Sequence, residues 1–272
     1  MIQDIYPSKL KNEFQNVAIS QEDPIFIFNK EGKMLLGGEG DICFPMGKDV
    51  KFDSSIYLFA IDDTKYFLTF GTQDVEIDGF NYYTIREVRD RFAGKEVYAV
   101  FTAYHLWKWY SDNVFCGKCA ERLAPDDKER ALRCPKCGNV IYPRINPAVI
   151  VGVTNGDRLL LTKYKIGYGS NAMVAGFTEI GETLEETVAR EVMEEAGLKV
   201  KNIRYYKSQP WGMALDILTG FYCDVDGDDR ITMDESELKY AEWVKREEII
   251  LQPNNLSLTN EMMRMFKEGK RV

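Results

Sequence analysis

Short runs of apolar residues, separated by turn-forming residues, characterise the first part of the chain. Residues 25–28 and 34–36 flank a turn that ends in Gly32, and residues 56–61 and 66–70 flank an Asp-Asp turn. Apolar runs of this length around Gly, Asn and Asp are typical of paired strands. The pattern therefore predicts two β-hairpins.

Longer patterns follow this region. Residues 85–109 are mostly helix formers with an interruption at Gly94, which predicts one or two helices at the end of a β-rich domain over residues 1–113. Residues 114–144 form a short segment marked by cysteines. Strands and helices alternate over residues 145–272, which predicts an α/β or α+β domain there.

The composition is that of a folded protein with an acidic balance. Hydrophobic residues make up 45% and charged residues 29% of the 272 positions, which argues against disorder. The formal net charge of −8 disfavours non-specific binding to nucleic acid or to an anionic membrane surface. Since no apolar run approaches the ~20 residues of a membrane helix and the first residues lack a signal-peptide pattern, we expect a cytoplasmic protein with no membrane partner.

The chain has a single histidine, His105, within an aromatic stretch. One histidine cannot supply the multi-His zinc sites or the non-haem iron triads of many hydrolases and oxygenases. A Ser-His-Asp triad would need His105, and no nucleophile-elbow pattern lies near it. We therefore interpret His105 as a packed or surface residue.

Two CxxC motifs mark the short segment over residues 114–144. Their cysteines are Cys116, Cys119, Cys134 and Cys137. Paired CxxC turns present four thiolates to one tetrahedral Zn²⁺, and a site with four protein ligands is closed and structural. The alternatives are unrelated core thiols or a redox dithiol, for which the surrounding βαβ pattern is missing. Because some thirty residues are too few for a core, we expect the metal to supply the folding energy.

The segment from Gly176 to Leu198 has the pattern of a loop followed by a capped helix. Thr183 and Glu186 have the spacing of a capping box, and Gly197 suits the left-handed position that ends a helix. Apolar residues recur every four positions between these signals and predict a buried stripe: Leu184, Val188 and Val192.

Three glutamates share a neighbouring arc of the same helix: Glu191, Glu194 and Glu195. Like charges at this spacing repel, and a divalent cation resolves the repulsion. Hard oxygen ligands favour Mg²⁺ or Mn²⁺, which implies metal-assisted attack of water on a phosphate, with any of the three glutamates able to take the proton. Glutamates on a helix are more commonly a solvated face, so the residues around them decide. Glu182 and Arg190 are expected to pair and brace the loop.

The complete pattern is Gly-x5-Glu-x7-Arg-Glu-Val-x-Glu-Glu-x-Gly-Leu. At every fixed position it resembles the Nudix box of the Nudix hydrolases, which cleave nucleoside diphosphates linked to another group. The resemblance implies an α/β/α sandwich for the catalytic domain over residues 145–272. The whole chain is then an α+β protein, in which a β-rich domain and a four-cysteine zinc ribbon precede the Nudix domain.

The ribbon, the segment from Tyr142 to Pro147 and the sequence Ser208-Gln209-Pro210-Trp211 together resemble the NADH pyrophosphatase family over about residues 84–263. The resemblance implies hydrolysis of NAD(H) to NMN(H) and AMP, and NAD-cap removal from RNA in some members. It implies as ligands of Mg²⁺ or Mn²⁺ the three box glutamates, Glu237 and the carbonyl of Ala175. The resemblance also implies that Tyr142 and Phe177 bind the substrate by ring stacking. The further substrate-binding residues that it implies are Gln209, Pro210, Trp211, Arg86, Glu129 and Thr259.

The resemblance fails after Trp211. The family usually continues Pro-Phe-Pro with a Ser two residues later, whereas this chain has Gly212-Met213-Ala214-Leu215-Asp216, which loses pre-organised contact area. We therefore keep ADP-ribose and dinucleoside polyphosphates as alternative substrates. A third hypothesis is that the ribbon and the Nudix domain sense a nucleotide without cleaving it. The intact Nudix box argues against this hypothesis. The resemblance also implies a homodimer, if ribbon residues reach the substrate.

Overall fold

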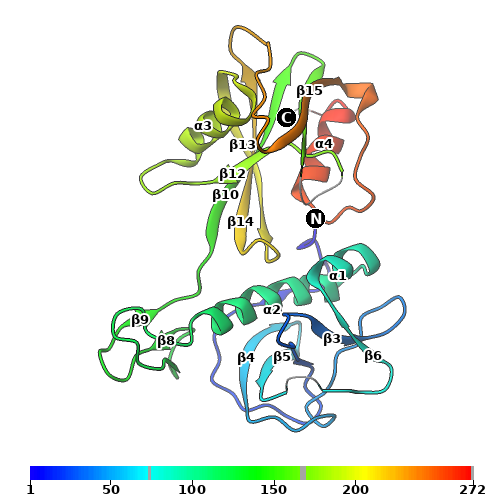
Figure 1. The fold of residues 1–272 in the computed structure, drawn as a ribbon. Coiled ribbons are helices and arrows are strands. Elements are labelled where there is room, and N and C mark those ends of the chain that lie inside the picture. Colours follow the sequence, from blue (N-terminus) through cyan, green and yellow to red (C-terminus); the bar gives the residue numbers. More distant parts are fainter. Residues whose placement is uncertain (73–74, 166–169, 271–272) are drawn as a thin grey trace. The chain divides into compact units, whose positions relative to one another are not determined.

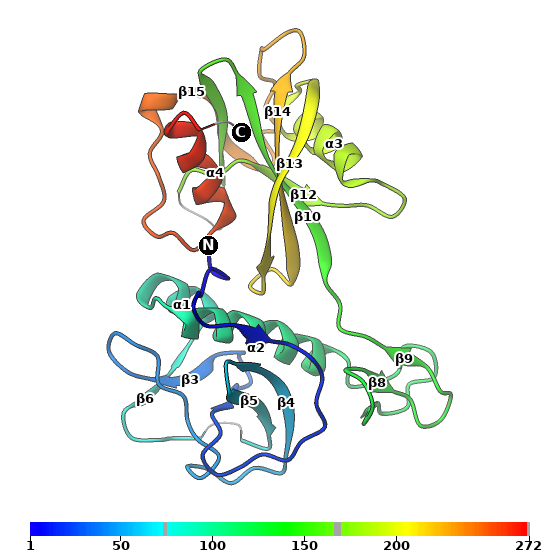
Figure 2. The ribbon, with the colours of Figure 1, turned by 180° about the vertical axis from the view of Figure 1, so that it is seen from behind.

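The computed structural model describes residues 1–72, 75–165 and 170–270, which form two compact units (Figures 1 and 2). One unit contains residues 2–144 together with Gly212–Leu215. The other contains Met1 and the rest of the chain. None of the helices in the described ranges is long and apolar enough to span a bilayer.

The first unit is β-rich, as expected, with a four-stranded sheet in the order β1-β4-β5-β2 and a two-stranded sheet of β3 and β6. The strands are β1 (Leu10–Lys11), β2 (Ile25–Phe26), β3 (Met34–Gly37), β4 (Ser54–Ile61), β5 (Thr64–Phe70) and β6 (Phe80–Tyr83). The predicted hairpin of β4 and β5 is confirmed by their antiparallel register.

The hairpin expected for the other two apolar runs is confirmed at its turn. Phe28 and Met34 form an antiparallel bridge, flanked by backbone bonds from Leu35 to Ile27 and from Asn29 to Lys33. Farther from the turn the runs part, since β2 pairs in parallel with β5 and β3 pairs with β6. Ile25 and Leu35 are at most 2% exposed, and strands buried in this way also pair with segments beyond the nearest turn.

Two helices follow, and the break at Gly94 is confirmed. They are α1 (Ile85–Arg91) and α2 (Lys95–Asp112). Thr84 caps α1 in a capping box with Glu87, and Gly94 adopts a φ of 89° between the helices. This conformation favours glycine, so the chain separates the two helices there.

The ribbon is a small three-stranded sheet of β7 (Ala124–Pro125), β8 (Leu132–Arg133) and β9 (Val140–Ile141). Arg130, between the two cysteine pairs, reaches into the β-rich part of the same unit. Its guanidinium donates to Asn12 Oδ1 at 2.8 Å and to the carbonyl of Leu58 in β4. Asn16 also donates to the carbonyl of Asp127. The ribbon is thus tied to the β-rich domain by hydrogen bonds from two side chains, Arg130 and Asn16.

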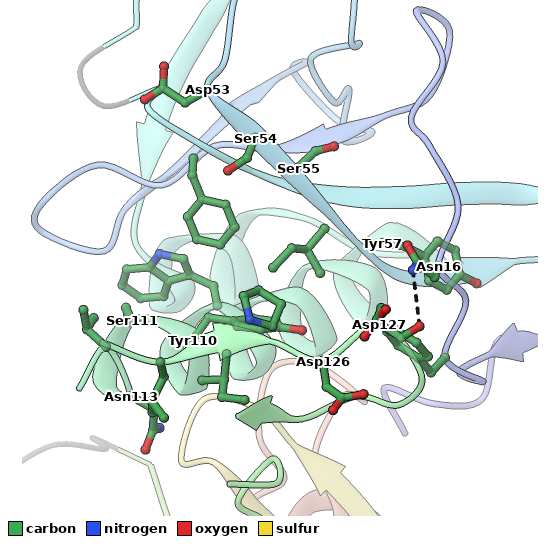
Figure 3. Close-up of a pocket in the computed structure, with 18 of the residues that line it drawn as sticks. Asn16, Asp53, Ser54, Ser55, Tyr57, Tyr110, Ser111, Asn113, Asp126 and Asp127 are labelled. Carbon is green, nitrogen blue, oxygen red and sulfur yellow. Dashed lines mark hydrogen bonds between the residues drawn. The ribbon is translucent and has the colours of Figure 1, made fainter. Parts of the chain in front are cut away.

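A cavity of about 920 Å³ lies in this unit, where β4, the end of α2 and the ribbon meet (Figure 3). Asp53 and Ser54 line it from β4 and its approach, and Asp126 and Asp127 line it from the ribbon. Among the described residues that line it, none is a predicted catalytic or substrate-binding residue. The predicted chemistry therefore belongs elsewhere in the chain.

The second unit is built on a six-stranded sheet in the order β13-β14-β10-β11-β15, with β12 paired to β10. The strands are β10 (Asn146–Asn155), β11 (Arg158–Tyr164), β12 (Val174–Phe177), β13 (Val200–Trp211), β14 (Asp216–Val225) and β15 (Leu238–Lys245). β10 pairs in parallel with β14, while the other pairs are antiparallel. The predicted hairpin of β10 and β11 is confirmed.

Helices cover both faces of this sheet (Figures 1 and 2): α3 (Leu184–Ala196) on one face and α4 (Leu258–Lys267) on the other, with a 3₁₀ turn at Arg246–Glu248. Alternate residues of β10 face opposite helices. Val149 and Val151 pack with the α3 residues, and Ile150 packs with the α4 residues. The expected α/β/α sandwich is confirmed.

Candidate active site

The helix that carries the three glutamates forms as its sequence predicts. Thr183 accepts from the backbone N–H of Glu186, whose carboxylate accepts from the backbone of Thr183. Gly197 ends the helix in the left-handed conformation with φ 68°. Val188 and Val192 are fully buried in the core beneath it. These local signals fix which face of α3 carries the carboxylates.

Arg190 connects the loop before α3 to the glutamates on it. Its guanidinium donates to Glu182 at 2.6 and 2.9 Å, which confirms the expected pair. The same group donates to Glu191 at 2.7 Å, to Glu194 at 3.0 Å and to the carbonyl of Phe177 at 2.9 Å. The hydrogen bond from Arg190 lowers the pKa of Glu182 to about 2. Glu182 is therefore a permanent anion that braces Arg190.

Glu195 is the most deeply buried of the three glutamates, with 5% of its surface exposed. Its carboxylate accepts from the Tyr164 hydroxyl at 3.3 Å and from the backbone N–H of Ala175 at 3.4 Å. Burial raises its pKa to about 8, and the charges of Glu191 and Glu237 add to the effect. Burial also raises the pKa of Glu191. Burial and the neighbouring carboxylates thus disfavour the charged form of Glu195 unless a cation compensates for it.

Sheet register brings Glu237 toward this cluster. Leu238, the first residue of β15, pairs with Tyr164 at the end of β11, and the carbonyl of Glu237 accepts from the backbone of Lys165. The charge of Glu237 raises the pKa of both Glu191 and Glu195. A residue more than forty positions from α3 therefore contributes to the same electrostatic site.

Strand β12 passes very close to α3. A Cβ added to Gly176 would lie 2.0 Å from the carboxyl carbon of Glu191. Any side chain at this position would displace the carboxylate. Glycine here lets the backbone that carries the Ala175 carbonyl approach the glutamates.

The donor set suits a hard divalent cation. It consists of carboxylate oxygens with one backbone carbonyl, the ligands that Mg²⁺ and Mn²⁺ prefer. Arg190 pairs with the carboxylates of Glu191 and Glu194. The oxygen atoms of the glutamates are farther apart than the ribbon sulfurs, because within the described ranges the four cysteines are the set whose ligand atoms lie within 4.8 Å of one another. The buried charge of Glu195 is what a cation would compensate.

The four ribbon cysteines form a compact cage. The sulfurs of Cys116 and Cys137 lie 3.7 Å apart, and those of Cys119 and Cys134 lie 3.5 Å apart. A tetrahedral Zn²⁺ with bonds of about 2.3 Å needs sulfurs about 3.8 Å apart. The backbone N–H of Lys118 lowers the pKa of Cys116 to about 6, which favours a thiolate. The cage fits the expected ion.

Two residues predicted to bind substrate from the ribbon contact each other. The hydroxyl of Tyr142 donates to Glu129 at 3.0 Å, and the Tyr142 ring is 57% exposed. Phe177, in the other unit, is 52% exposed beside the Arg190 guanidinium. Both rings are free to stack on a base. Arg86 is an exposed residue of α1.

The substrate-binding residues predicted after the Nudix box differ in their burial. Gln209 is fully buried, and its amide joins the carbonyl of Leu256 to the backbone N–H of Leu258 at the start of α4. Thr259 is 9% exposed on the same helix. Pro210 is exposed and Trp211 is partly buried at the end of β13. In this structure Gln209 holds backbone in place.

His105 is a packed residue of α2. It is partly buried, and its Nε2 lies 2.8 Å from the carbonyl oxygen of Arg144. This agrees with its interpretation as a structural histidine.

Asp216 is buried at the start of β14, and one of its carboxylate oxygens lacks a partner among the described residues. Burial raises its pKa to about 7, against about 3.9 in an unfolded chain. The folded protein therefore holds a proton that the unfolded chain releases between these values, and stability falls as the pH rises from about 4 to 7.

Asp216→Asn is expected to remove this dependence. The variant gains stability over the parent as the pH rises, by up to about 4 kcal/mol at pH 8, because three pKa units correspond to about this free energy. Melting temperatures at pH 4.5 and pH 8 test this, with Asp63→Asn, an exposed aspartate, as the control. An identical pH profile for Asp216→Asn and the parent would contradict the assignment.

Comparison with known proteins agrees with this geometry. Residues 144–266 match the NUDIX domain, and residues 111–142 match the NADH pyrophosphatase zinc ribbon domain. This chain contains a Nudix domain. The two matches place a ribbon directly before a Nudix domain, as expected from the sequence.

Curated relatives of this Nudix protein carry the name NAD-capped RNA hydrolase NudC. The protein from Enterobacter sp. (strain 638) is 41% identical over 171 residues, which cover 62% of this chain and 66% of the relative. The protein from Salmonella schwarzengrund (strain CVM19633) is 39% identical with the same coverage. The match thus spans just under two thirds of these relatives' length.

A solved structure shares the fold. The crystal structure of a NUDIX hydrolase from Nitrosomonas europaea matches with a TM-score of 0.50 and 24% sequence identity. The match covers 57% of this chain and 90% of that chain. This similarity bears on the fold alone.

Proposed function

We propose that this Nudix protein hydrolyses the pyrophosphate bond of NAD(H), giving NMN(H) and AMP, with the NAD cap of RNA as a larger substrate of the same chemistry. The observation that carries the proposal is the cluster of Glu191, Glu194 and Glu195 around the backbone of β12. The names of the ribbon match and of the curated relatives support the choice of NAD among nucleoside diphosphate derivatives.

The metals follow from the donor sets. Glu191, Glu194, Glu195 and the Ala175 carbonyl would hold Mg²⁺ or Mn²⁺, with Glu237 as a further ligand, and the ribbon cysteines would hold structural Zn²⁺. When bound, a divalent cation neutralises pyrophosphate charge and makes water a better nucleophile at neutral pH.

The protein's own groups then have distinct tasks. Glu182 holds Arg190, and Arg190 orients the carboxylates of Glu191 and Glu194 by direct hydrogen bonds. A carboxylate of this cluster takes the proton from the attacking water. Phe177, whose backbone carbonyl accepts from Arg190, offers an exposed ring on which a base of the substrate would stack.

The test is a product assay on the purified protein. Incubation with NADH and Mg²⁺ is expected to give equimolar NMNH and AMP. Values of kcat/KM are then compared for NADH, NAD⁺, ADP-ribose, a dinucleoside tetraphosphate and NAD-capped RNA, because specificity is the ratio of these quantities. A higher kcat/KM for ADP-ribose than for NADH would identify ADP-ribose as the preferred substrate and leave the proposed pyrophosphate hydrolysis unchanged. Binding without turnover of any of them would favour the sensor reading.

Gly176→Ala is expected to reduce kcat/KM for NADH by about a hundredfold. The added methyl occupies the position of the Glu191 carboxylate and must push it away. Gly40→Ala is the matched control, since a Cβ there meets open space. Equal activities of the two variants would argue against the close approach of β12 to α3 as a requirement for catalysis.

The expected homodimer stays a prediction. Size-exclusion chromatography with light scattering measures it directly, with a mass of about twice the 31.3 kDa chain as the expected result.

A further inference from the structure

The hydroxyl of Tyr164 contacts two of the proposed metal ligands at once. It lies 3.3 and 3.5 Å from the two carboxylate oxygens of Glu195, and 3.4 Å from the carbonyl oxygen of Ala175. The sequence pattern did not single out this residue. Its position joins the ligand from helix α3 to the ligand from strand β12.

The strand places the Tyr164 ring on the α3 face. Along β11, Leu160 packs with the α3 core, while Leu159 and Leu161 pack with the α4 core. Even-numbered positions therefore face α3. The register of β11 with β15 passes from Lys163–Tyr240 to Tyr164–Leu238, so the extra residue, Lys239, lies on β15 and the alternation along β11 continues to Tyr164.

The Glu195 carboxylate depends on few donors. Within the described part of the chain, its hydrogen bonds come from the Tyr164 hydroxyl and from the backbone N–H of Ala175. Arg190 donates to Glu191 and Glu194 instead. Tyr164 is thus the side chain that orients the most buried glutamate.

We propose that Tyr164 is a positioning residue of the divalent-metal site, which donates its hydroxyl proton to the Glu195 carboxylate and lies against the Ala175 carbonyl. This inference rests on the proposed function. A phenol carries its proton at neutral pH, so it can donate to Glu195 without adding charge. Groups that orient metal ligands in this way typically change metal affinity by about 10- to 100-fold.

The test compares Mn²⁺ binding to the full-length protein and to Tyr164→Phe, measured by electron paramagnetic resonance and calorimetry. The variant is expected to bind Mn²⁺ about tenfold more weakly. Its kcat/KM for NADH is expected to fall at low Mn²⁺ and to recover toward the parent value at saturating Mn²⁺. Zinc content stays unchanged, since the ribbon is untouched.

Tyr222→Phe is the matched control. Tyr222 is a buried residue of the same sheet whose hydroxyl donates to the carbonyl of Met262 on the α4 side, so the loss of this hydroxyl leaves Mn²⁺ affinity unchanged. The second comparison places Tyr164→Phe in a Glu195→Ala background. If Tyr164 acts through Glu195, it has no further effect on Mn²⁺ affinity there. This cycle does not depend on comparing folded stabilities.

An unchanged Mn²⁺ affinity of Tyr164→Phe in an active parent protein would overturn the inference and leave the proposed function standing. The inference would also be overturned if Tyr164→Phe weakened Mn²⁺ binding as much in the Glu195→Ala background as in the parent protein. A parent protein that neither binds Mn²⁺ nor hydrolyses NADH would overturn the proposed function, and the role of Tyr164 with it.

Discussion

Glu195→Gln is expected to lower kcat/KM for NADH by about a thousandfold, which corresponds to about 4 kcal/mol of transition-state stabilisation. The change keeps the shape of the side chain and removes the charge that a divalent cation would bind. Glu195 is also the ligand with the least freedom to be replaced by water, because it is 5% exposed. Initial rates of AMP release, with Mg²⁺ varied, measure the loss.

Glu185→Gln provides the control for this substitution. Glu185 lies in the first turn of the same helix and is exposed. The control variant is expected to keep the parent rate. A Glu195→Gln protein with the parent's rate would mean that the buried carboxylate serves the fold and not the reaction.

Cys134→Ser is expected to remove zinc and unfold the ribbon. Four thiolates supply the binding energy that a segment of this size uses for folding, with apparent values of about 10–16 kcal/mol for structural zinc in small domains. Cys134 is buried within the cage, so a serine there leaves three ligands and a hydroxyl that binds zinc poorly. Chelation of the parent protein has the same expected result.

Metal analysis and limited trypsin digestion check this prediction. The parent holds one zinc per chain and resists cleavage after Lys118 and Lys136, whereas the variant lacks zinc and is cut there. Cys43→Ser is the control, because Cys43 is exposed and lies outside the cage. Retention of zinc and of protease resistance by Cys134→Ser would show that the ribbon folds by other means.

The parts of the site that follow from local rules could be predicted from the sequence. The capping box of Thr183 and Glu186, the terminating Gly197 and the helical spacing of the glutamates depend on residues within four positions of one another. The cysteine cage is similar, because each CxxC turn is a local structure. The pair of Glu182 and Arg190 also formed as expected.

Features that depend on pairing between distant segments could not be predicted in the same way. Ile25 lies in a run buried on every side, and nothing in such a run indicates its parallel pairing with Phe67, more than forty positions away. The role of Tyr164 depends on the position of β11 beside α3 and on the depth of Glu195. The Gln209 amide bonds to backbone 47 and 49 residues away. These contacts exist only once the sheet has formed.

The contacts of Arg130 with the β-rich domain limit where the chain can be truncated. A truncated product that begins at residue 114 would lose Asn12 and the Leu58 carbonyl, and would leave a partly buried guanidinium in water. Fragments for expression should therefore keep the ribbon with the segment before it. Chimeras in which the ribbon is exchanged between relatives need to include the residues that accept hydrogen bonds from Arg130, namely Asn12 and Leu58.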